Sequence, residues 1–231
     1  MKIAIIPARG GSKRIPRKNI RLFAGKPIIA YSIETAIASG LFDRVIVSTE
    51  DTEIAEISTR HGADVPFRRP PNLSDDEAST DTVVFHAIAE CERIYGPVRQ
   101  GCCLYPTSPL LTTADLARGF DLLLEYAATS AFPVVKYDFP IDQAFALEGV
   151  RLRARWPEML SSRSQFLPDY YHDAGMFYWF DVAKVLLAGQ LFCDDCVAFP
   201  IPAERCQDIN TEDDWALAEL KYRSLARLTN A

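Results

Sequence analysis

Short apolar runs alternate with segments of helical periodicity along most of this chain, and this alternation restricts its possible folds more than any other feature. The apolar runs are rich in Ile and Val, as in Lys2–Pro7 (KIAIIP) and Arg44–Thr49 (RVIVST). Nearly continuous apolar strands between amphipathic helices are typical of a parallel sheet covered on both faces. We therefore predict an α/β fold, Rossmann-like, with a mainly parallel sheet and helices on both faces.

The remaining elements are predicted from the same patterns. Further strands are expected at Ala63–Phe67, Gly101–Tyr105, Ser130–Val135, Met176–Phe180 and Val197–Ile201. Helices are expected at Pro27–Ser39, Thr52–Gly62, Thr80–Tyr95, Thr112–Ala127 and Asn210–Leu228. Such sheets bind ligands beyond the carboxyl ends of their strands, so the loops after strands are the expected place for a site.

Residues 136–172 interrupt this alternation. The segment is rich in Pro, Arg and aromatic residues, as at Phe139-Pro140 and Trp156-Pro157. We interpret the chain as a single domain, 1–231, with an inserted arm at 136–172. A long excursion from a domain is often functional or contributes an oligomer contact.

Bulk composition excludes several classes of protein. The net charge of −6 argues against a uniformly basic nucleic-acid protein, and 48% hydrophobic residues argue against disorder. No apolar run approaches the length of a membrane span, and no signal peptide is recognisable, so we expect a soluble, cytoplasmic protein without a membrane partner. The six Cys are expected to be reduced thiols. Cys193 and Cys196 have zinc-like spacing but lack a second pair.

A basic loop with two glycines directly follows the first predicted strand. Residues 1–33 hold eight Lys or Arg and no Asp or Glu, and five of these cations surround Gly10 and Gly11. Paired glycines let the backbone approach a ligand, and phosphate oxygens accept strong hydrogen bonds from cations. We therefore predict that this loop binds a polyphosphate. The alternative is a solvated basic loop that touches RNA.

The loop matches neither common nucleotide motif. The pattern G-x-x-x-x-G-K-[ST] is absent, and so is G-x-G-x-x-G. The second absence argues against a nicotinamide oxidoreductase.

The loop does resemble the N-terminal motif of the CMP-sialic acid synthetase family, cytidylyltransferases that activate nine-carbon sugar acids. This resemblance rests on Ile6–Ile20 (IPARGGSKRIPRKNI). It continues through Gly25–Asp51, Leu104–Leu111 (LYPTSPLL) and Gln207–Trp215 (QDINTEDDW). It implies a reaction of CTP with a nonulosonic acid that gives a CMP-sugar and pyrophosphate.

Two further segments resemble the pseudaminic acid cytidylyltransferase branch of this family, Phe132–Asp142 and Trp156–Phe180. Sialic acid enzymes usually have Gln before the PTSP loop and Arg after it, where this chain has Tyr105 and Leu111. The resemblance therefore implies pseudaminic acid as the sugar. The alternatives are CMP-N-acetylneuraminate or CMP-legionaminate synthesis, or a non-catalytic nucleotide- or RNA-binding protein.

The resemblance also implies a nucleotide site and its catalytic cations. Lys13, Arg9 and Lys18 are the expected catalytic residues, with Lys13 stabilising charge in the transition state. The expected nucleotide-binding residues are Ala8, Arg9, Gly10, Gly11, Ser12, Lys13, Lys18, Asn19, Arg69, Ser79 and Thr80. Arg69 matches a family arginine at the base.

Asp208 and Asn210 match a family position that is usually Asp-x-Asp, which implies a Mg²⁺ site. Mg²⁺ prefers oxygen ligands, and two such side chains on one face of an extended segment can meet one cation. Asn210 carries no charge and has a second possible role, as a cap of the final helix.

The sugar site is implied by the PTSP loop, the arm and the segment after it. The expected substrate-binding residues are Tyr105, Thr107, Ser108, Arg163, Gln165, Tyr171, His172, Asp173 and Gly175. His172 is either a general base or a structural residue. In this family the arm is usually exchanged between subunits, so the resemblance implies a homodimer and no nucleic-acid partner.

Overall fold

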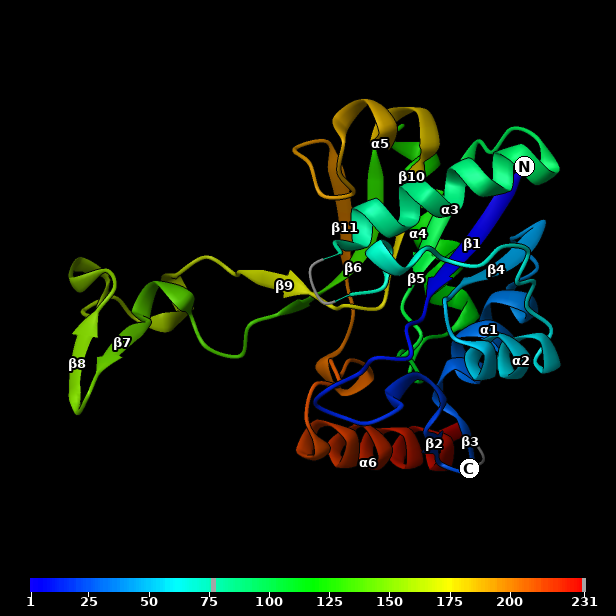
Figure 1. Ribbon diagram of the computed structural model, residues 1–231. Helices are drawn as coiled ribbons and strands as arrows, with labels where there is room; N and C mark the ends of the chain where they lie inside the picture. Colours follow the sequence, from blue (N-terminus) through cyan, green and yellow to red (C-terminus); the bar gives the residue numbers. More distant parts are fainter. Residues whose placement is uncertain (76–77, 230–231) are drawn as a thin grey trace.

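A seven-stranded sheet forms the centre of the computed structural model, which describes residues 1–75 and 78–229 (Figure 1). Six strands lie in the order β11-β6-β10-β5-β1-β4, and β9 pairs with β6 beside them. Their bounds are β1 Lys2–Pro7, β4 Arg44–Ser48, β5 Gln100–Leu104, β6 Ser130–Lys136, β9 Tyr171–Asp173, β10 Phe177–Asp181 and β11 Cys196–Pro200. β1 is parallel to β4 and β5, and β11 is parallel to β6. The predicted mainly parallel α/β sheet is therefore confirmed.

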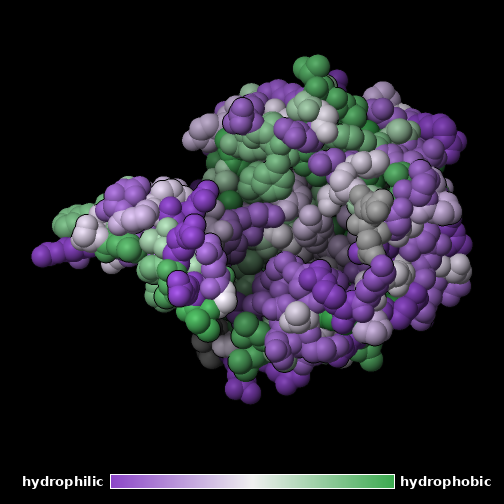
Figure 2. Space-filling model, turned by 60° about the vertical axis from the view of Figure 1, so that its left-hand side comes forward, coloured by the Kyte–Doolittle hydropathy of each residue, from purple (hydrophilic) through white to green (hydrophobic). Residues whose placement is uncertain are grey.

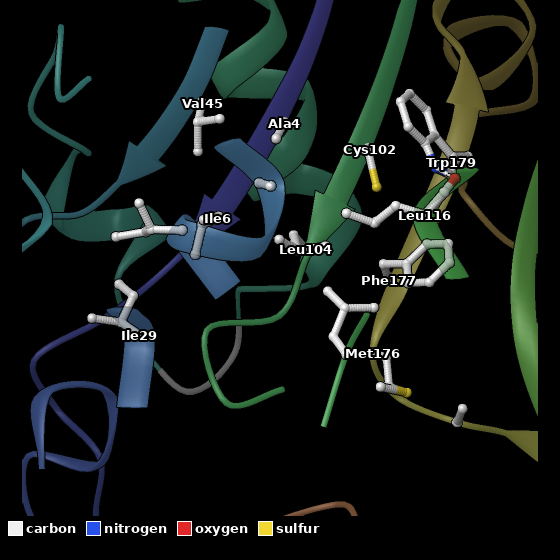
Figure 3. Close-up of a cluster of buried hydrophobic side chains, with 14 of the residues drawn as sticks. Ala4, Ile6, Ile29, Val45, Cys102, Leu104, Leu116, Met176, Phe177 and Trp179 are labelled. Atoms are coloured by element: carbon white, nitrogen blue, oxygen red, sulfur yellow. Dashed lines mark hydrogen bonds between the residues drawn. The ribbon is translucent and has the colours of Figure 1, made fainter. Parts of the chain in front are cut away.

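Helices cover both faces of this sheet. Their bounds are α1 Ile28–Ser39, α2 Thr52–Arg60, α3 Thr80–Tyr95, α4 Thr113–Glu125, α5 Val182–Ala188 and α6 Glu212–Thr229. Successive side chains of a strand point to opposite faces of the sheet, so β1 contributes residues to two apolar clusters. Ala4 and Ile6 pack with Leu116 of α4 in one cluster (Figure 3), whereas Ile3 and Ile5 join the cluster to which α3 and α5 contribute.

One strand of the sheet runs against its neighbours. β10 is antiparallel to both β5 and β6. The chain leaves the sheet at Lys136, the last residue of β6, and passes through the arm. It then comes back beside the same end of β6 and forms β9, which is antiparallel to β6. No crossover helix carries the chain back to the end of the sheet where β6 begins. The next strand, β10, therefore enters the sheet in the reverse direction.

The predicted strand at Ala63–Phe67 is wrong. Only Asp64 is bridged to the sheet there, opposite Ile46. Its N–H donates to Val45 O and its carbonyl accepts from the Val47 N–H. Pro66 follows two residues later and has no N–H to extend the pairing, so a single bridge remains. The short helix α5 was not predicted.

A third apolar cluster holds the basic loop against the C-terminal segment. Ile15 of the loop packs with Phe23, Ile209 and Trp215, and Arg21 lies over the Trp215 ring. Small elements in this region are η1 Lys18–Ile20, the strand pair β2 Leu22–Phe23 and β3 Lys26–Pro27, and η6 Ala203–Arg205. The cluster brings two ends of the sequence together beside the carboxyl edge of the sheet.

The arm projects away from the sheet and its helices (Figure 1). It contains η3 Ile141–Gln143, the hairpin of β7 Phe145–Glu148 and β8 Arg151–Ala154, η4 Pro157–Met159 and η5 Ser164–Phe166. Many of its apolar side chains are exposed, including Phe139, Leu147, Leu152 and Phe166. Among the described helices, none is long and apolar enough to cross a membrane.

Candidate active site

A cavity of about 430 Å³ lies at the edge of the sheet where β1 and β5 end. Its lining comprises Pro7, Arg9, Ser12, Lys13, Arg14, Ile15, Lys18, Asn19, Arg69, Leu73, Asp75, Ala78, Thr80, Val83, Tyr105, Pro106, Thr107, Asp208 and Asn210. Figure 2 shows a hollow in the body of the molecule with mainly hydrophilic residues around it. The cavity therefore brings together the basic loop, the PTSP loop and the Asp208 segment.

Polar side chains of the basic loop and η1 stabilise the shape of the loop. Asn19 is buried and donates from Nδ2 to Arg9 O at 2.9 Å. Lys18 Nζ donates to Ile209 O at 2.7 Å, which ties the loop to the C-terminal segment. Burial lowers the pKa of Lys18, although Asp208 acts in the opposite direction. A desolvated cation of this kind interacts strongly with any anion that enters the cavity.

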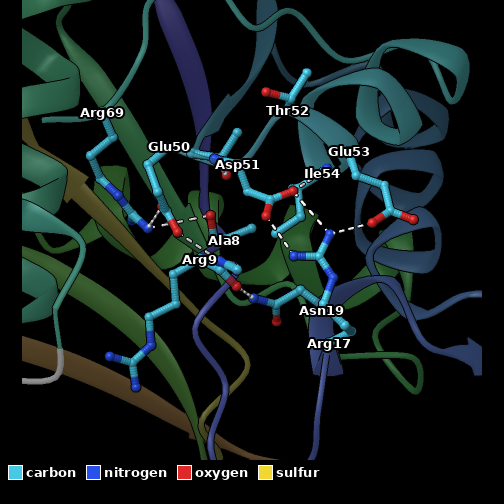
Figure 4. A network of polar contacts seen from close by, with 12 residues as sticks. Ala8, Arg9, Arg17, Asn19, Glu50, Asp51, Thr52, Glu53, Ile54 and Arg69 are labelled. Carbon is cyan, nitrogen blue, oxygen red and sulfur yellow. Dashed lines mark hydrogen bonds and ion pairs between the residues drawn. The ribbon is translucent and has the colours of Figure 1, made fainter. Parts of the chain in front are cut away.

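Glu50 was not predicted, yet it joins the loop to Arg69 (Figure 4). Its Oε1 accepts the Gly10 N–H at 2.7 Å, and its Oε2 accepts Arg69 Nη2 at 2.8 Å. Arg69 also donates to Ala8 O at 3.3 Å, and 3% of its side chain is exposed. Burial by itself would raise the pKa of Glu50, but the Gly10 N–H and the Arg69 guanidinium outweigh it and the pKa is lowered.

Arg17 does not line the cavity, although it lies among the cations that surround the glycines in sequence. It adopts a left-handed backbone conformation, with φ of 54°. Its guanidinium donates to both oxygens of Asp51, at 2.5 and 3.0 Å, and to Glu53 at 2.5 Å (Figure 4). This contact holds the pKa of Asp51 below its ordinary value. A Cβ on Gly10 would stand 2.5 Å from Asp51 Oδ2, so a larger residue there would displace the carboxylate that Arg17 binds.

Asp208 and Asn210 contact each other and the basic loop. Asn210 Nδ2 donates to Asp208 Oδ2 at 2.5 Å, and Arg14 donates to Asn210 Oδ1 at 2.7 Å. The helix cap suggested as the other role of Asn210 is made by Thr211 instead, whose Oγ1 accepts the Asp214 N–H. A carboxylate and an amide oxygen are suitable donors for Mg²⁺.

These two oxygen donors do not complete a metal site by themselves. No group of three His, Cys, Asp or Glu side chains able to hold a metal ion occurs in residues 1–75 and 78–229. The zinc-like pair is likewise made of free thiols, with Cys193 and Cys196 Sγ atoms 3.8 Å apart. Mg²⁺ is commonly bound through one or two carboxylates plus substrate phosphates. Asp208 and Asn210 therefore fit a cation that arrives with a polyphosphate.

Two of the residues expected at the sugar site line the cavity. Tyr105 and Thr107 line it, and Tyr105 Oη lies 3.4 Å from Thr80 Oγ1. Burial raises the pKa of Tyr105. Ser108 is buried and donates to Met176 O at 3.3 Å, so its side chain stabilises the turn. Asp173 Oδ2 accepts a hydrogen bond from the Tyr178 hydroxyl.

A second cavity adjoins the first and shares Asp208 and Asn210 with it. Its volume is about 470 Å³, and its lining includes His172, Asp173 and Lys221. His172 Nδ1 lies 2.9 Å from Asp173 O, and its ring packs against Tyr137 with centroids 5.0 Å apart. The described structure provides no carboxylate partner that would orient His172 as a base.

The remaining expected site residues do not line the first cavity. Ala8 and Gly10 contribute backbone groups behind it, through the contacts with Arg69 and Glu50. Ser79 caps α3, where its side chain accepts the Thr82 N–H. These are the other residues outside the lining: Gly11, Tyr171 and Gly175, together with Arg163 and Gln165 of the arm. Thus the nucleotide set is largely brought together in one chain, whereas the sugar set is spread over two cavities and the arm.

The chain is similar along nearly its whole length to proteins of known activity. Residues 3–187 match the sequence model of a family described as cytidylyltransferase. The chain is 42% identical over 226 residues to the pseudaminic acid cytidylyltransferase of Campylobacter jejuni subsp. jejuni serotype O:2, covering 96% of each chain. It is 38% identical over 233 residues to the CMP-N,N'-diacetyllegionaminic acid synthase of Legionella pneumophila subsp. pneumophila, covering 94% of each chain.

The fold is also similar to that of a solved structure of another CMP-sugar synthetase. A CMP:2-keto-3-deoxy-manno-octonic acid synthetase complexed with CTP superposes with a TM-score of 0.68, over 98% of this chain and 99% of that chain. The two sequences are 16% identical. At that identity the likeness shows the fold alone, and it agrees with the family found by sequence.

Proposed function

The chain belongs to the cytidylyltransferase family, and from this premise we propose that it activates pseudaminic acid, a nonulosonic acid, with CTP. The products are the CMP-sugar and pyrophosphate. The observation that carries this proposal is the 42% identity over 96% of both chains to a pseudaminic acid cytidylyltransferase. The residues of the first cavity support the nucleotide half of the reaction.

The triphosphate of CTP is assigned to the basic loop. Arg9, Lys13 and Lys18 line one wall of the cavity, and Ser12 and Asn19 add polar side chains. A triphosphate is multiply charged, so several cations held in one place neutralise it with little loss of entropy on binding. The base is assigned to the end of the cavity lined by Arg69, whose guanidinium donates to the Ala8 carbonyl behind it.

Mg²⁺ is assigned to Asp208 and Asn210, with the phosphates of CTP as its further ligands. When bound, Mg²⁺ would neutralise phosphate charge and orient the phosphates. On the protein side, Arg14 must release Asn210 Oδ1, and the Asn210 amide must turn from Asp208, for both oxygens to face one cation.

The chemistry requires alignment and neutralisation of charge more than a strong nucleophile. The anomeric hydroxyl of the sugar attacks the α-phosphorus and loses its proton to water, and pyrophosphate leaves with the electron pair of the broken P–O bond. Lys13 and Arg9 would stabilise the negative charge that builds up on the phosphate oxygens. Lys18 is fixed by Ile209 and so presents its charge without reorganisation.

The sugar is assigned to the junction of the two cavities. Tyr105 and Thr107 lie on the nucleotide side of this junction, and Asp173 and His172 lie on the other. Arg163 and Gln165 lie in the arm and not in the lining of the first cavity. We therefore propose a homodimer in which each arm brings these two residues to the partner subunit.

The test is pyrophosphate release with CTP and a panel of nonulosonic acids. Turnover with pseudaminic acid, and little with legionaminic or N-acetylneuraminic acid, is the expected result. Preference for legionaminic acid would replace the sugar and keep the reaction; the 38% identity to a legionaminic acid enzyme makes this the second candidate. Tight CTP or RNA binding without release from any sugar would indicate a non-catalytic binding protein.

A further inference from the structure

Glu50 lies between two parts of the proposed nucleotide site without lining the cavity. Its Oε1 accepts the Gly10 N–H at 2.7 Å, and its Oε2 accepts Arg69 Nη2 at 2.8 Å (Figure 4). Gly10 belongs to the basic loop after β1, whereas Arg69 comes from the segment between α2 and α3. One carboxylate thus joins the phosphate end of the site to the base end.

Arg69 depends on this carboxylate for its charge balance. Only 3% of its side chain is exposed, and 26% of the Glu50 side chain is. The other hydrogen bonds of the Arg69 guanidinium, to Ala8 O and Ser74 Oγ, are both 3.3 Å long and go to neutral groups. A buried guanidinium that loses its counter-ion is costly, so without Glu50 Arg69 would turn toward water.

The backbone around Glu50 is itself fixed. Arg68 Nη1 donates to Glu50 O at 2.7 Å, and the Arg69 N–H donates to Thr49 O at 3.0 Å. Glu50 follows β4, and the N-cap residue Asp51 follows it in turn. The carboxylate therefore starts from a rigid support, which is the condition for holding another group in place.

We propose that Glu50 is a positioning residue for the nucleotide: its carboxylate holds the Gly10 peptide, and with it the course of the basic loop, and it holds the Arg69 guanidinium in the orientation in which Arg69 meets CTP. This rests on the proposed function, because the nucleotide assignment of the cavity does. A consequence is that the Gly10 N–H is bonded to Glu50 rather than to phosphate. The triphosphate is then held by the cations of the loop and not by this amide.

Two substitutions separate the charge of Glu50 from its reach. Glu50→Gln offers one acceptor oxygen and one NH₂ group, so it satisfies either Gly10 or Arg69 and presents a donor to the other. Glu50→Asp keeps the charge but is one methylene shorter, so it reaches one partner well and the other poorly. A hydrogen bond to a charged group contributes enough that its loss changes affinity by about 10- to 100-fold.

The experiment measures steady-state pyrophosphate release with CTP and sugar varied separately. For Glu50→Gln the KM for CTP is expected to rise by about 10- to 100-fold, with kcat and the KM for sugar near those of the native enzyme. A purely structural role would instead lower the amount of active enzyme, and hence the apparent kcat, at an unchanged KM. Glu50→Asp should show a smaller rise in the KM for CTP. It also tests the proposal if Glu50→Gln does not fold.

Two matched measurements complete the test. Glu56→Gln, an exposed residue of α2, makes the same chemical change away from the cavity and should leave both KM values unchanged. In an Arg69→Ala background, Glu50→Gln should raise the KM for CTP by much less than in the native chain, because one of its two partners is gone. Equal factors in both backgrounds, or a native KM for CTP in Glu50→Gln, would overturn the proposal. If the native chain itself releases no pyrophosphate with any sugar, the proposed function fails first, and this inference fails with it.

Discussion

At the scale of single residues, the cations of the basic loop have different tasks. Arg17 is bound by Asp51 and Glu53 outside the cavity, and Lys18 is held by Ile209. Lys13 lines the cavity on the same loop. Similar residues, a few positions apart, thus divide into one that stabilises the loop, one that is fixed in place and one that lines the cavity.

Lys13→Ala should lower kcat by about 10²–10³-fold, the usual cost of removing one preorganised group that stabilises transition-state charge. Steady-state pyrophosphate release measures this, with circular dichroism to check the fold. Lys26→Ala is the matched control, since Lys26 belongs to the same basic segment but pairs with Glu34 outside the cavity. Normal turnover of a folded Lys13→Ala variant would remove Lys13 from the chemistry.

Asn210→Asp should lower the Mg²⁺ concentration needed for half-maximal rate by about tenfold, equivalent to about 1.4 kcal/mol. A second carboxylate would stand beside Asp208, where the two side chains already touch. Titrating Mg²⁺ at saturating CTP measures the effect. Gln190→Glu makes the same amide-to-acid change at an exposed position and should have none. An unchanged Mg²⁺ requirement would argue that Asn210 is not a ligand.

At the scale of elements, the ends of helices are defined by hydrogen bonds between residues that are close together in the sequence. Thr112 and Asp115 form a capping box at the start of α4, and Asp115 also accepts two hydrogen bonds from Arg205, at 2.8 and 2.9 Å. The cap therefore also ties α4 to η6. That link stabilises the segment that leads to Asp208.

Thr112→Ala should lower the free energy of unfolding by about 1 kcal/mol, the typical value of an N-cap. Urea denaturation followed by circular dichroism measures it. Thr113→Ala, one residue later and exposed on the same helix, removes a similar side chain without removing the cap. Its effect should stay within about 0.5 kcal/mol. Equal losses in the two variants would contradict a capping role.

At the scale of the whole molecule, the arm has too little core to be stable by itself. Leu147 and Leu152 are cross-strand partners of the β7–β8 hairpin, and 68% and 66% of their surfaces are exposed. A two-stranded hairpin is marginally stable in water unless something packs on it. Exposed apolar patches of this kind commonly mark protein–protein contacts. These facts support the proposed homodimer.

Leu147→Glu should therefore shift the chain from dimer to monomer in sedimentation velocity, because a charge would be buried in the contact. Pyrophosphate release should fall with it if Arg163 and Gln165 reach the partner subunit. Leu187→Glu places the same charge on an exposed leucine at the end of α5 and should leave the assembly unchanged. A native chain that sediments as a monomer, or a dimeric Leu147→Glu variant, would contradict the arm contact.

How much of this could be predicted from the sequence depends on the range of the interaction. The strand Lys2–Pro7 and the helix Thr80–Tyr95 were predicted with their observed bounds, because apolar periodicity and caps are local. The strand expected at Ala63–Phe67 failed because Pro66 limits pairing, which local β propensity does not reveal. The direction of β10 was also not predicted, since it depends on the edge at which the arm returns.

By itself the sequence determined the α/β class, the basic loop and the resemblance to one family, because each of these depends on residues that are close together in the sequence. Only the tertiary structure decided which side chains meet. Glu50 is 19 residues from Arg69 and 40 from Gly10, yet it bonds to both, and Arg17 leaves the cavity for carboxylates 34 and 36 residues away. Such pairings depend on how strands and loops are brought together in space. The sequence shows where the charged side chains are, but not which oppositely charged side chain each of them contacts.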